Sequence, residues 1–396
     1  MSRRTTLSLP IAGFAFGVVL FWAALYVYGP TLPPHAQSLG ASATMIGLIV
    51  GSYGFTQLIL RIPLGILSDR LGQRKAFVLL GFVTTSISSV ILALAANPTF
   101  MLLGRSLAGV AACAWVPCTV LFCNFYSPSQ AVRATSIMSF SASFGQMVAT
   151  LSGGYIARSL GTVAPFWVAL AVALIGLAIM SPAHEERTAT GSTPSLRAIL
   201  SVLTLPTLLT VSLVAAISQY ASIATSHAFV SVYATDVLHL DAAALGILSF
   251  AALVPNAIMA ATVAVLATRV REKWLITAGL LLLAISTAAI PLTRSYAALL
   301  GARVVFGFGV GLTYPVLMGL SVKSVPQAQR ASAMGAFQAI YALGMTAGPA
   351  LSGFIKDHFG LSPVFWVTGV MCLLGLLPIW ASVRSGSERK ENPAQE

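Results

Sequence analysis

The sequence predicts an all-α membrane protein in which twelve transmembrane helices form two pseudo-symmetric six-helix bundles. The chain of 396 residues is 57% hydrophobic and only 8% charged, whereas soluble domains are about 45–50% apolar. Apolar stretches of roughly 20 residues, enough to cross the hydrocarbon layer as a helix, recur along it. The twelve predicted spans are 9–30, 43–66, 76–96, 101–125, 134–157, 163–181, 205–230, 242–267, 274–293, 297–321, 332–355 and 363–383.

The first span follows a basic start, MSRRTT, and could be mistaken for a signal peptide. No A-x-A-like cleavage site follows the apolar run, which ends in YVYGPTLPP, and further spans come after it. We therefore expect it to remain as an uncleaved first helix.

An internal repeat divides the chain into two halves. Adding 199 to a residue number of the first half repeatedly gives a matching residue, and near residue 105 the offset becomes 198. We predict an N-terminal bundle at 1–180, a cytoplasmic linker at 181–204 and a C-terminal bundle at 205–396. Matching pairs include Gly47 and Gly246, Arg70 and Arg269, Gly145 and Gly344, Gly154 and Gly353, Arg105 and Arg303, and Trp167 and Trp366.

The net charge of +12 indicates membrane orientation and not a nucleic-acid partner. With the N-terminus inside, the predicted cytoplasmic segments hold 16 of the 22 Lys and Arg residues and the outer segments hold three. This asymmetry follows the positive-inside rule, so we expect both termini to be cytoplasmic in a bacterial inner membrane. Cys113, Cys118 and Cys123 are spaced five apart and do not converge on one helix face. No metal or other cofactor is expected.

The stretch GILSDRLGQRK between the second and third spans contains a motif that resembles the loop motif of a known protein family. It matches the G-x-x-x-D-R-x-G-x-[RK]-[RK] loop of the major facilitator superfamily, and the resemblance extends over nearly the whole chain. The matching residues are Gly65, Asp69, Arg70, Gly72, Arg74 and Lys75. The resemblance implies a conformational switch in which Asp69 latches the second span against the positive N-terminal end of the eleventh.

Two further motifs refine the resemblance. The fourth span has R-x-x-x-G at Arg105 and Gly109, as the family does. The fifth span reads GQMVATLSGG, with Ala149 and Thr150 where the antiporter branch has Gly and Pro. The resemblance to the drug and metabolite efflux branch is therefore partial.

The predicted spans contain cations but no acid near their middle. Arg105 and Arg303 should face the interior, because an intramembrane arginine costs about 2.5–3.5 kcal/mol. His227 is the one histidine predicted inside a span, which makes it a candidate for proton coupling; a packing role is the alternative. An interior with this charge should favour neutral or anionic solutes over lipophilic cations.

Polar and aromatic residues at the estimated midplane form the candidate substrate site between the halves. Gln57 and Asn256 are repeat-related, and each member of the set could instead bridge two helices. Besides Arg105 and Arg303, the set comprises Trp22, Gln57, Trp115, Gln146, Gln219, Tyr220, Asn256, Tyr314, Gln338 and Tyr341.

These features predict a monomeric secondary transporter that binds a small-molecule substrate in the lipid bilayer and works by alternating access. We expect efflux coupled to a proton gradient, with uptake of an organic anion as the alternative. An enzyme is not expected, because no span contains paired acids, a Ser/His/Asp set or metal-spaced histidines. A transporter-like sensor is a further alternative, although the tails and loops are too short to hold a signalling domain.

Overall fold

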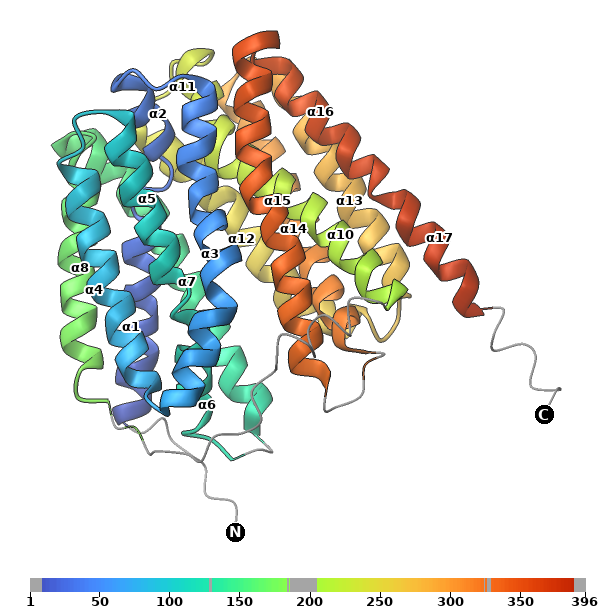
Figure 1. The fold of residues 1–396 in the computed structure, drawn as a ribbon. Helices are drawn as coiled ribbons and strands as arrows, with labels where there is room; N and C mark the ends of the chain where they lie inside the picture. Colours follow the sequence, from blue (N-terminus) through green and yellow to red (C-terminus); the bar gives the residue numbers. More distant parts are fainter. Residues whose placement is uncertain are drawn as a thin grey trace. The chain divides into compact units, whose positions relative to one another are not determined.

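The computed structural model describes residues 9–127, 130–183, 185, 205–323, 325 and 329–387, and this part of the chain is helical without strands (Figure 1). The first half contains α1 (Leu9–Tyr26), α2 (Leu32–Ser38), α3 (Ala43–Leu71), α4 (Arg74–Ala93), α5 (Pro98–Ala112), α6 (Trp115–Cys123), α7 (Ala131–Leu160) and α8 (Ala164–Met180). The second contains α10 (Pro206–Ala221), the π-helix η2 (Ser222–Phe229), α11 (Val230–Asp236), α12 (Ala242–Leu266), α13 (Glu272–Ala289), the 3₁₀ turn η3 (Ile290–Leu292), α14 (Tyr296–Lys323), α15 (Arg330–Phe359), α16 (Leu361–Leu374) and α17 (Leu376–Ser387).

Every predicted span overlaps a helix or a run of adjoining helices. Within the described residues, eight helical segments are long and apolar enough to cross a membrane, and Ile11–Tyr26 and Ala164–Met180 are shorter apolar helices. The structure is therefore that of an all-helical membrane protein, while the full number of twelve crossings remains a prediction. The eight segments are Ala43–Ser68, Arg74–Ala93, Pro98–Cys123, Pro206–Asp236, Ala242–Val263, Glu272–Leu292, Tyr296–Lys323 and Leu361–Ala381.

Three local features were not anticipated from the sequence. The short helix α2 lies in a segment predicted to be a loop. The fourth predicted span is divided between α5 and α6, because Pro117 has no N–H to donate to the Cys113 carbonyl and its ring crowds that group. In the seventh span, η2 interrupts the α-helical pattern where the Thr225 hydroxyl donates to the Ala221 carbonyl.

The chain forms two compact units. Unit 1 comprises Met1–Ala41, Phe55–Thr193 and Asp241–Phe250, and unit 2 comprises Ser42–Gly54, Pro194–Leu240 and Ala251–Glu396. Two segments belong to the unit that is formed mostly by the other half of the sequence. The first part of α3 belongs to unit 2, and the first part of α12 belongs to unit 1.

The same helix pairings occur in both units. In unit 1, α1 packs against α7, and α4 packs against α5 and α8. In unit 2, their repeat-related counterparts pair in the same way: α10 packs against α15, and α13 packs against α14 and α16. The sequence repeat is thus accompanied by a repeated packing pattern.

The first part of α3 and the first part of α12 are called the exchanged segments below, because each belongs to the unit of the other half. Glycines allow close helix crossings at both of them. In unit 1, a Cβ at Gly154 would lie 2.8 Å from the Gly246 Cα, so α7 and the start of α12 touch through their backbones. In unit 2, a Cβ at Gly353 on α15 would overlap the Ala43 carbonyl at the start of α3. Gly353 is the repeat mate of Gly154, and Ala43 is that of Ala242, which lies beside Gly154. Small residues at such crossings let helix backbones approach.

The loop between α3 and α4 begins with a glycine in the left-handed conformation. The N-terminus of α4, which follows this loop, contacts an acidic residue of the predicted linker. Gly72 has φ +59°, a conformation that glycine adopts without strain. The Glu185 carboxylate accepts hydrogen bonds from the backbone N–H groups of Arg74 at 2.6 Å and Lys75 at 3.1 Å. An anion at these N–H groups stabilises the α4 N-terminus.

We expect Glu185→Ala to lower the free energy of unfolding by about 0.5–2 kcal/mol, the usual cost of losing a helix cap. The measurement is the thermal unfolding midpoint of the purified protein in detergent. Gln73→Ala is the matched control, because Gln73 occupies the N-cap position of α4 without a capping side-chain hydrogen bond. Equal midpoints for the two variants would show that Glu185 does not stabilise α4.

Candidate functional site

In unit 1, the predicted site residues include a pair of indoles in edge-to-face contact. The rings of Trp22 on α1 and Trp115 at the start of α6 meet edge to face, with centroids 5.4 Å apart, and Tyr26 lies 5.8 Å from Trp22. The Trp22 side chain is buried, and its Nε1–H has no hydrogen-bond partner in the structure. A buried indole donor usually finds an acceptor, so this N–H is available to a bound molecule.

Gln57 on α3 is 3% exposed, and its side-chain oxygen accepts a hydrogen bond from Arg61, one turn further along the same helix. The amide therefore provides an acceptor for an intramembrane cation. Gln146 on α7 is half-buried in the same unit. The structure thus gives Gln57 a defined structural partner within its own helix.

In unit 2, three rings form a cluster on α14 and α15. Phe337 is fully buried, and its centroid lies 5.7 Å from that of Tyr341 and 6.3 Å from that of Tyr314. The two tyrosine rings meet edge to face at 5.9 Å. Phe337 was not among the predicted site residues, but its ring packs against two residues that were.

Other predicted residues of unit 2 have separate environments. The Tyr220 hydroxyl lies 3.2 Å from the Ser352 hydroxyl, so it connects α10 to α15. Gln219, Asn256 and Gln338 are half-buried. The backbone of Asn256 is held close to α14, since a Cβ at Gly311 would lie 2.8 Å from the Asn256 carbonyl oxygen.

Arg105 in α5 is 6% exposed and is paired within unit 1. Its Nη1 donates to the Tyr28 hydroxyl at 3.2 Å, and its guanidinium lies 5.6 Å from the Tyr28 ring centroid. The tyrosine therefore supplies both a hydrogen-bond acceptor and a π-face.

Arg303 in α14 repeats this arrangement with a smaller partner. It is 1% exposed, its Nη2 donates to the Ser226 hydroxyl on η2, and its guanidinium lies 4.8 Å from the Phe306 ring centroid. Both arginine pairs join residues 77 positions apart, and Tyr28 and Ser226 differ by the same 198 as the arginines. Once the structure has identified one hydroxyl partner, the repeat offset gives the position of the other.

His227 lies on η2, next to Ser226, and is half-buried. Its Nδ1 is 3.3 Å from the Ser222 carbonyl oxygen, five residues earlier. A π-helical turn inside an α-helical span is frequently found at functional sites. The proton-coupling role of His227 remains a prediction.

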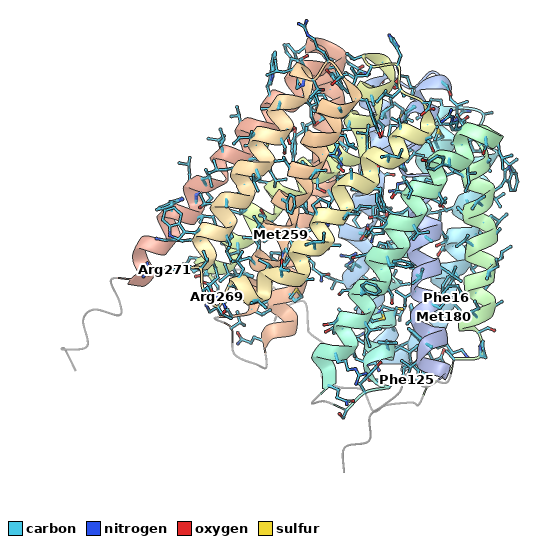
Figure 2. All side chains as sticks on the ribbon, turned by 180° about the vertical axis from the view of Figure 1, so that it is seen from behind. Phe16, Phe125, Met180, Met259, Arg269 and Arg271 are labelled. Atoms are coloured by element: carbon cyan, nitrogen blue, oxygen red, sulfur yellow. The ribbon has the colours of Figure 1, made fainter. Side chains whose placement is uncertain are left out.

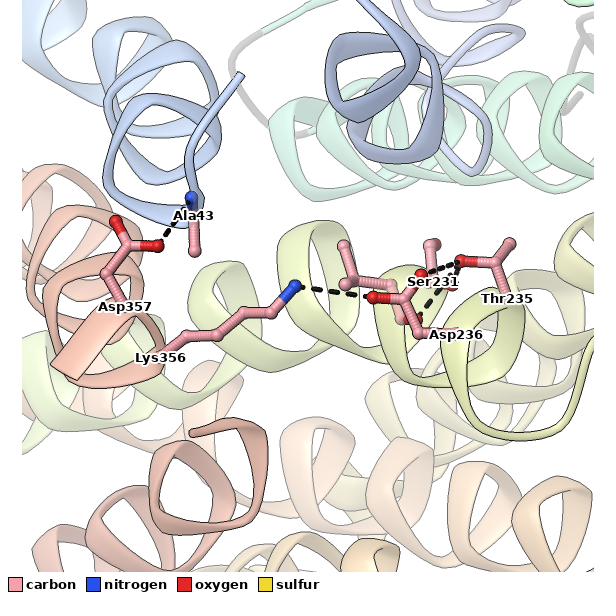
Figure 3. Close-up of polar contacts among 7 residues, drawn as sticks. Ala43, Ser231, Thr235, Asp236, Lys356 and Asp357 are labelled. Carbon is pink, nitrogen blue, oxygen red and sulfur yellow. Dashed lines mark hydrogen bonds and ion pairs between the residues drawn. The ribbon is translucent and has the colours of Figure 1, made fainter. Parts of the chain in front are cut away.

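The acids that the structure describes outside the linker lie at helix ends, as the sequence indicated. Figure 3 shows Lys356 and Asp357 at the end of α15 in contact with two different helices. Lys356 pairs with Asp236 of α11 at 3.4 Å. Asp357 accepts hydrogen bonds from the backbone N–H groups of Ala43 at 3.0 Å and Thr44 at 2.8 Å at the start of α3.

Burial would raise the pKa of Asp357, but the hydrogen bonds from Thr44 and Ala43 and the charge of Lys356 together hold that pKa below its ordinary value. Because the pKa is lowered, the contact with α3 is stabilising at neutral pH and is lost as the pH falls through the lowered pKa. In unit 1, Arg158 of α7 pairs with Asp241 before α12 at 3.2 Å. Arg158 is the repeat mate of Asp357, so both exchanged crossings end in a charged contact.

The structure describes some residues of the loop motif but not the side chain of Asp69. Gly72 makes the turn, Arg70 is exposed, and the backbone of Arg74 is held by Glu185. A Cβ at Gly65 would make an ordinary contact of 3.7 Å with Val116. The Asp69 side chain lies outside the described residues, and the latch stays a prediction.

Comparisons with known proteins agree with the motif. The profile of the Major Facilitator Superfamily matches residues 14–254 and 211–396. The chain is 26% identical to the inner membrane transport protein YajR of Escherichia coli (strain K12) over 404 residues, which cover 99% of this chain and 84% of YajR. It is also 27% identical to the quinolone resistance protein NorA of Staphylococcus aureus (strain MRSA252) over 180 residues, 45% of this chain and 46% of NorA.

The fold is also similar to that of solved transporters. A bacterial homolog to the human lysosomal transporter Spinster, in an inward-facing and occupied conformation, matches with a TM-score of 0.82 at 17% identity, over 97% of this chain and 98% of its own. The two regions that match the family profile together span nearly the whole sequence. The chain therefore belongs to the Major Facilitator Superfamily and is a membrane transporter of a small solute.

Proposed function

We propose that this protein exports a small, neutral or anionic amphipathic molecule across a bacterial inner membrane by alternating access, in exchange for protons. Its substrate contacts are rings and amides together with Arg105 and Arg303, and both termini are cytoplasmic. The protein works as a monomer. The direction is supported by the similarity to NorA, whose name gives it a role in quinolone resistance.

The observation that carries the choice of substrate is the charge of the buried groups. Arg105 and Arg303 are the buried charged side chains of the part that the structure describes. The described acids at the helix ends, such as Asp236 and Asp357, are more exposed. A lipophilic cation would be repelled by the buried guanidinium groups, whereas a neutral or anionic molecule would not.

We assign proton coupling to His227. The predicted spans have no mid-span carboxylate to carry the proton, and a histidine side chain can gain and lose a proton near neutral pH. Gly65, Asp69, Arg70, Gly72 and Arg74 act as the conformational switch. The alternative function is an uptake permease for an organic anion, which the buried arginines favour equally.

Transport in proteoliposomes with an imposed pH gradient tests this proposal. We expect neutral or anionic compounds to move in the direction opposite to the proton flux and to compete with one another. Quaternary ammonium dyes should be poor substrates. Transport of an organic anion in the same direction as protons would favour the uptake alternative. Tight, saturable binding of a quaternary ammonium dye would contradict the proposed substrate class.

The repeat-related amides are expected to respond differently to replacement by leucine. Asn256→Leu should weaken substrate binding about tenfold with little change in the unfolding midpoint, because a polar contact with substrate is lost. Gln57→Leu should lower binding and stability together, because Arg61 loses its acceptor. Binding isotherms and thermal unfolding of both variants are the measurements. A large loss of stability in Asn256→Leu would make that residue a helix bridge.

A further inference from the structure

Arg303 is a buried cation with two guanidinium nitrogens left over. The side chain is 1% exposed, and its Nε and Nη1 have no hydrogen-bond partner, while Nη2 donates to Ser226. The guanidinium remains charged in proteins. Burying a charge without a counter-charge and with unsatisfied donors is strongly unfavourable, so this arrangement calls for an additional partner.

The repeat mate shows what a better-satisfied arginine looks like in the same fold. Arg105 has the Tyr28 hydroxyl and ring as partners and makes a further interaction. At the corresponding position beside Arg303, the large tyrosine is replaced by Ser226. A serine supplies the hydroxyl but neither the ring nor its volume.

No described Asp or Glu forms an ion pair with Arg303. The guanidinium also lies beside the Phe306 ring, whose centroid is 4.8 Å from the guanidinium carbon. An aromatic face gives some electrostatic stabilisation but does not accept hydrogen bonds from the free N–H groups in the guanidinium plane. The missing partner is therefore an acceptor that approaches this plane and carries negative charge.

We propose that Arg303 and Ser226 form a binding site for one monovalent anion, either chloride or the carboxylate of the transported solute. One negative charge is sufficient, because Arg303 is the buried charged side chain of unit 2 among the described residues. The carboxylate form rests on the proposed function, whereas the site itself does not.

The π-helical segment η2 provides one wall of this site. Ser226 and Thr225 lie on η2, and the Thr225 hydroxyl donates to the Ala221 carbonyl one turn earlier. A π-helical turn inside an α-helix is rare and is frequently found at functional sites. The η2 segment places the Ser226 hydroxyl against the Arg303 guanidinium.

Equilibrium binding of radiolabelled chloride and radiolabelled benzoate to the purified protein in detergent tests the site. We expect saturable binding of one anion per chain and at least a tenfold loss of affinity in Arg303→Gln. Arg294→Gln, which removes an exposed cation of the same unit between η3 and α14, should retain the wild-type affinity. Circular dichroism and gel filtration establish that each variant is folded.

Ser226→Ala keeps the proposal testable if Arg303→Gln does not fold. It removes the hydroxyl that forms the site with Arg303 but leaves the cation, so the anion should bind severalfold more weakly than in the wild type. Unchanged affinity in Ser226→Ala would contradict the two-residue site. Chloride binding identifies a halide as the occupant, and binding of benzoate alone identifies a carboxylate; both support the site. No saturable binding of either anion, or unchanged binding in folded Arg303→Gln, would overturn it. Intact anion binding in a protein inactive in transport would separate this site from the proposed function.

Discussion

Gly153→Ala is expected to destabilise the protein by about 3 kcal/mol or more and to reduce the yield of folded protein. A Cβ at Gly153 on α7 would overlap the backbone carbonyl oxygen of Val27, just beyond the end of α1. That oxygen belongs to the main chain and cannot rotate away as a flexible side chain would. Helix movement must relieve the overlap, and overpacking of this kind typically costs about 1–3 kcal/mol and occasionally more. The measurement is the thermal unfolding midpoint in detergent, with gel filtration to quantify folded protein.

Gly13→Ala is the matched control for this substitution. Gly13 lies on α1, and a Cβ there would meet no atom within 4 Å. The two changes add the same methyl group and the same gain in helix propensity of about 1 kcal/mol. We expect the control to unfold at or slightly above the wild-type midpoint. If both variants behaved alike, the close crossing of α7 with the Val27 backbone would not be a feature of the folded protein.

Phe337→Ala is expected to lower the free energy of unfolding by about 2–4 kcal/mol and to weaken substrate binding at least tenfold. Phe337 is fully buried, and its ring contacts Tyr314 on α14 and Tyr341 on α15. Removing a buried ring from a soluble core costs about 3–5 kcal/mol. In a membrane the water-transfer part is absent and the packing part remains. Both tyrosines then lose the ring that orients them.

Phe16→Ala separates loss of packing from loss of an aromatic group as such. Phe16 on α1, labelled in Figure 2, is 52% exposed. We expect this variant to unfold within about 0.5 kcal/mol of the wild type and to bind substrate normally. A Phe337→Ala protein that loses stability but keeps full affinity would exclude Tyr314 and Tyr341 from the substrate site. The ligand for both assays is the best substrate found in the transport screen.

The exchanged segments extend the meaning of the repeat. The start of α3 contacts α15 through Ala43, Gly353 and Asp357, and the start of α12 contacts α7 through matching positions. The two crossings are related by sequence, but their charged contacts have opposite polarity. Asp357 binds backbone N–H groups at the start of α3, whereas its mate Arg158 binds the Asp241 carboxylate before α12. Duplication preserved the crossing geometry and allowed the side-chain chemistry to diverge.

Several features of the site could be predicted because they depend on local sequence. Gly72 was predicted as part of the loop motif between the second and third spans, and it has a positive φ, which only a residue without Cβ adopts easily. The absence of mid-span acids placed the described carboxylates at helix ends. Other features could not be predicted. Glu185 lies 111 residues from Arg74, and the sequence does not indicate that the linker returns to the start of α4.

The sequence by itself determined the helical membrane fold, the internal repeat and the family, because hydrophobicity over about 20 residues and a motif within one loop are read without knowing which helices are neighbours. Only the tertiary structure decided the partners of the buried groups. Tyr28 and Ser226 each lie 77 residues from their arginine, and Ala43 lies 314 residues from Asp357. Such contacts depend on helix pairing and on side-chain volume at the crossing, which is why Arg105 is nearly satisfied and Arg303 is left with two free nitrogens.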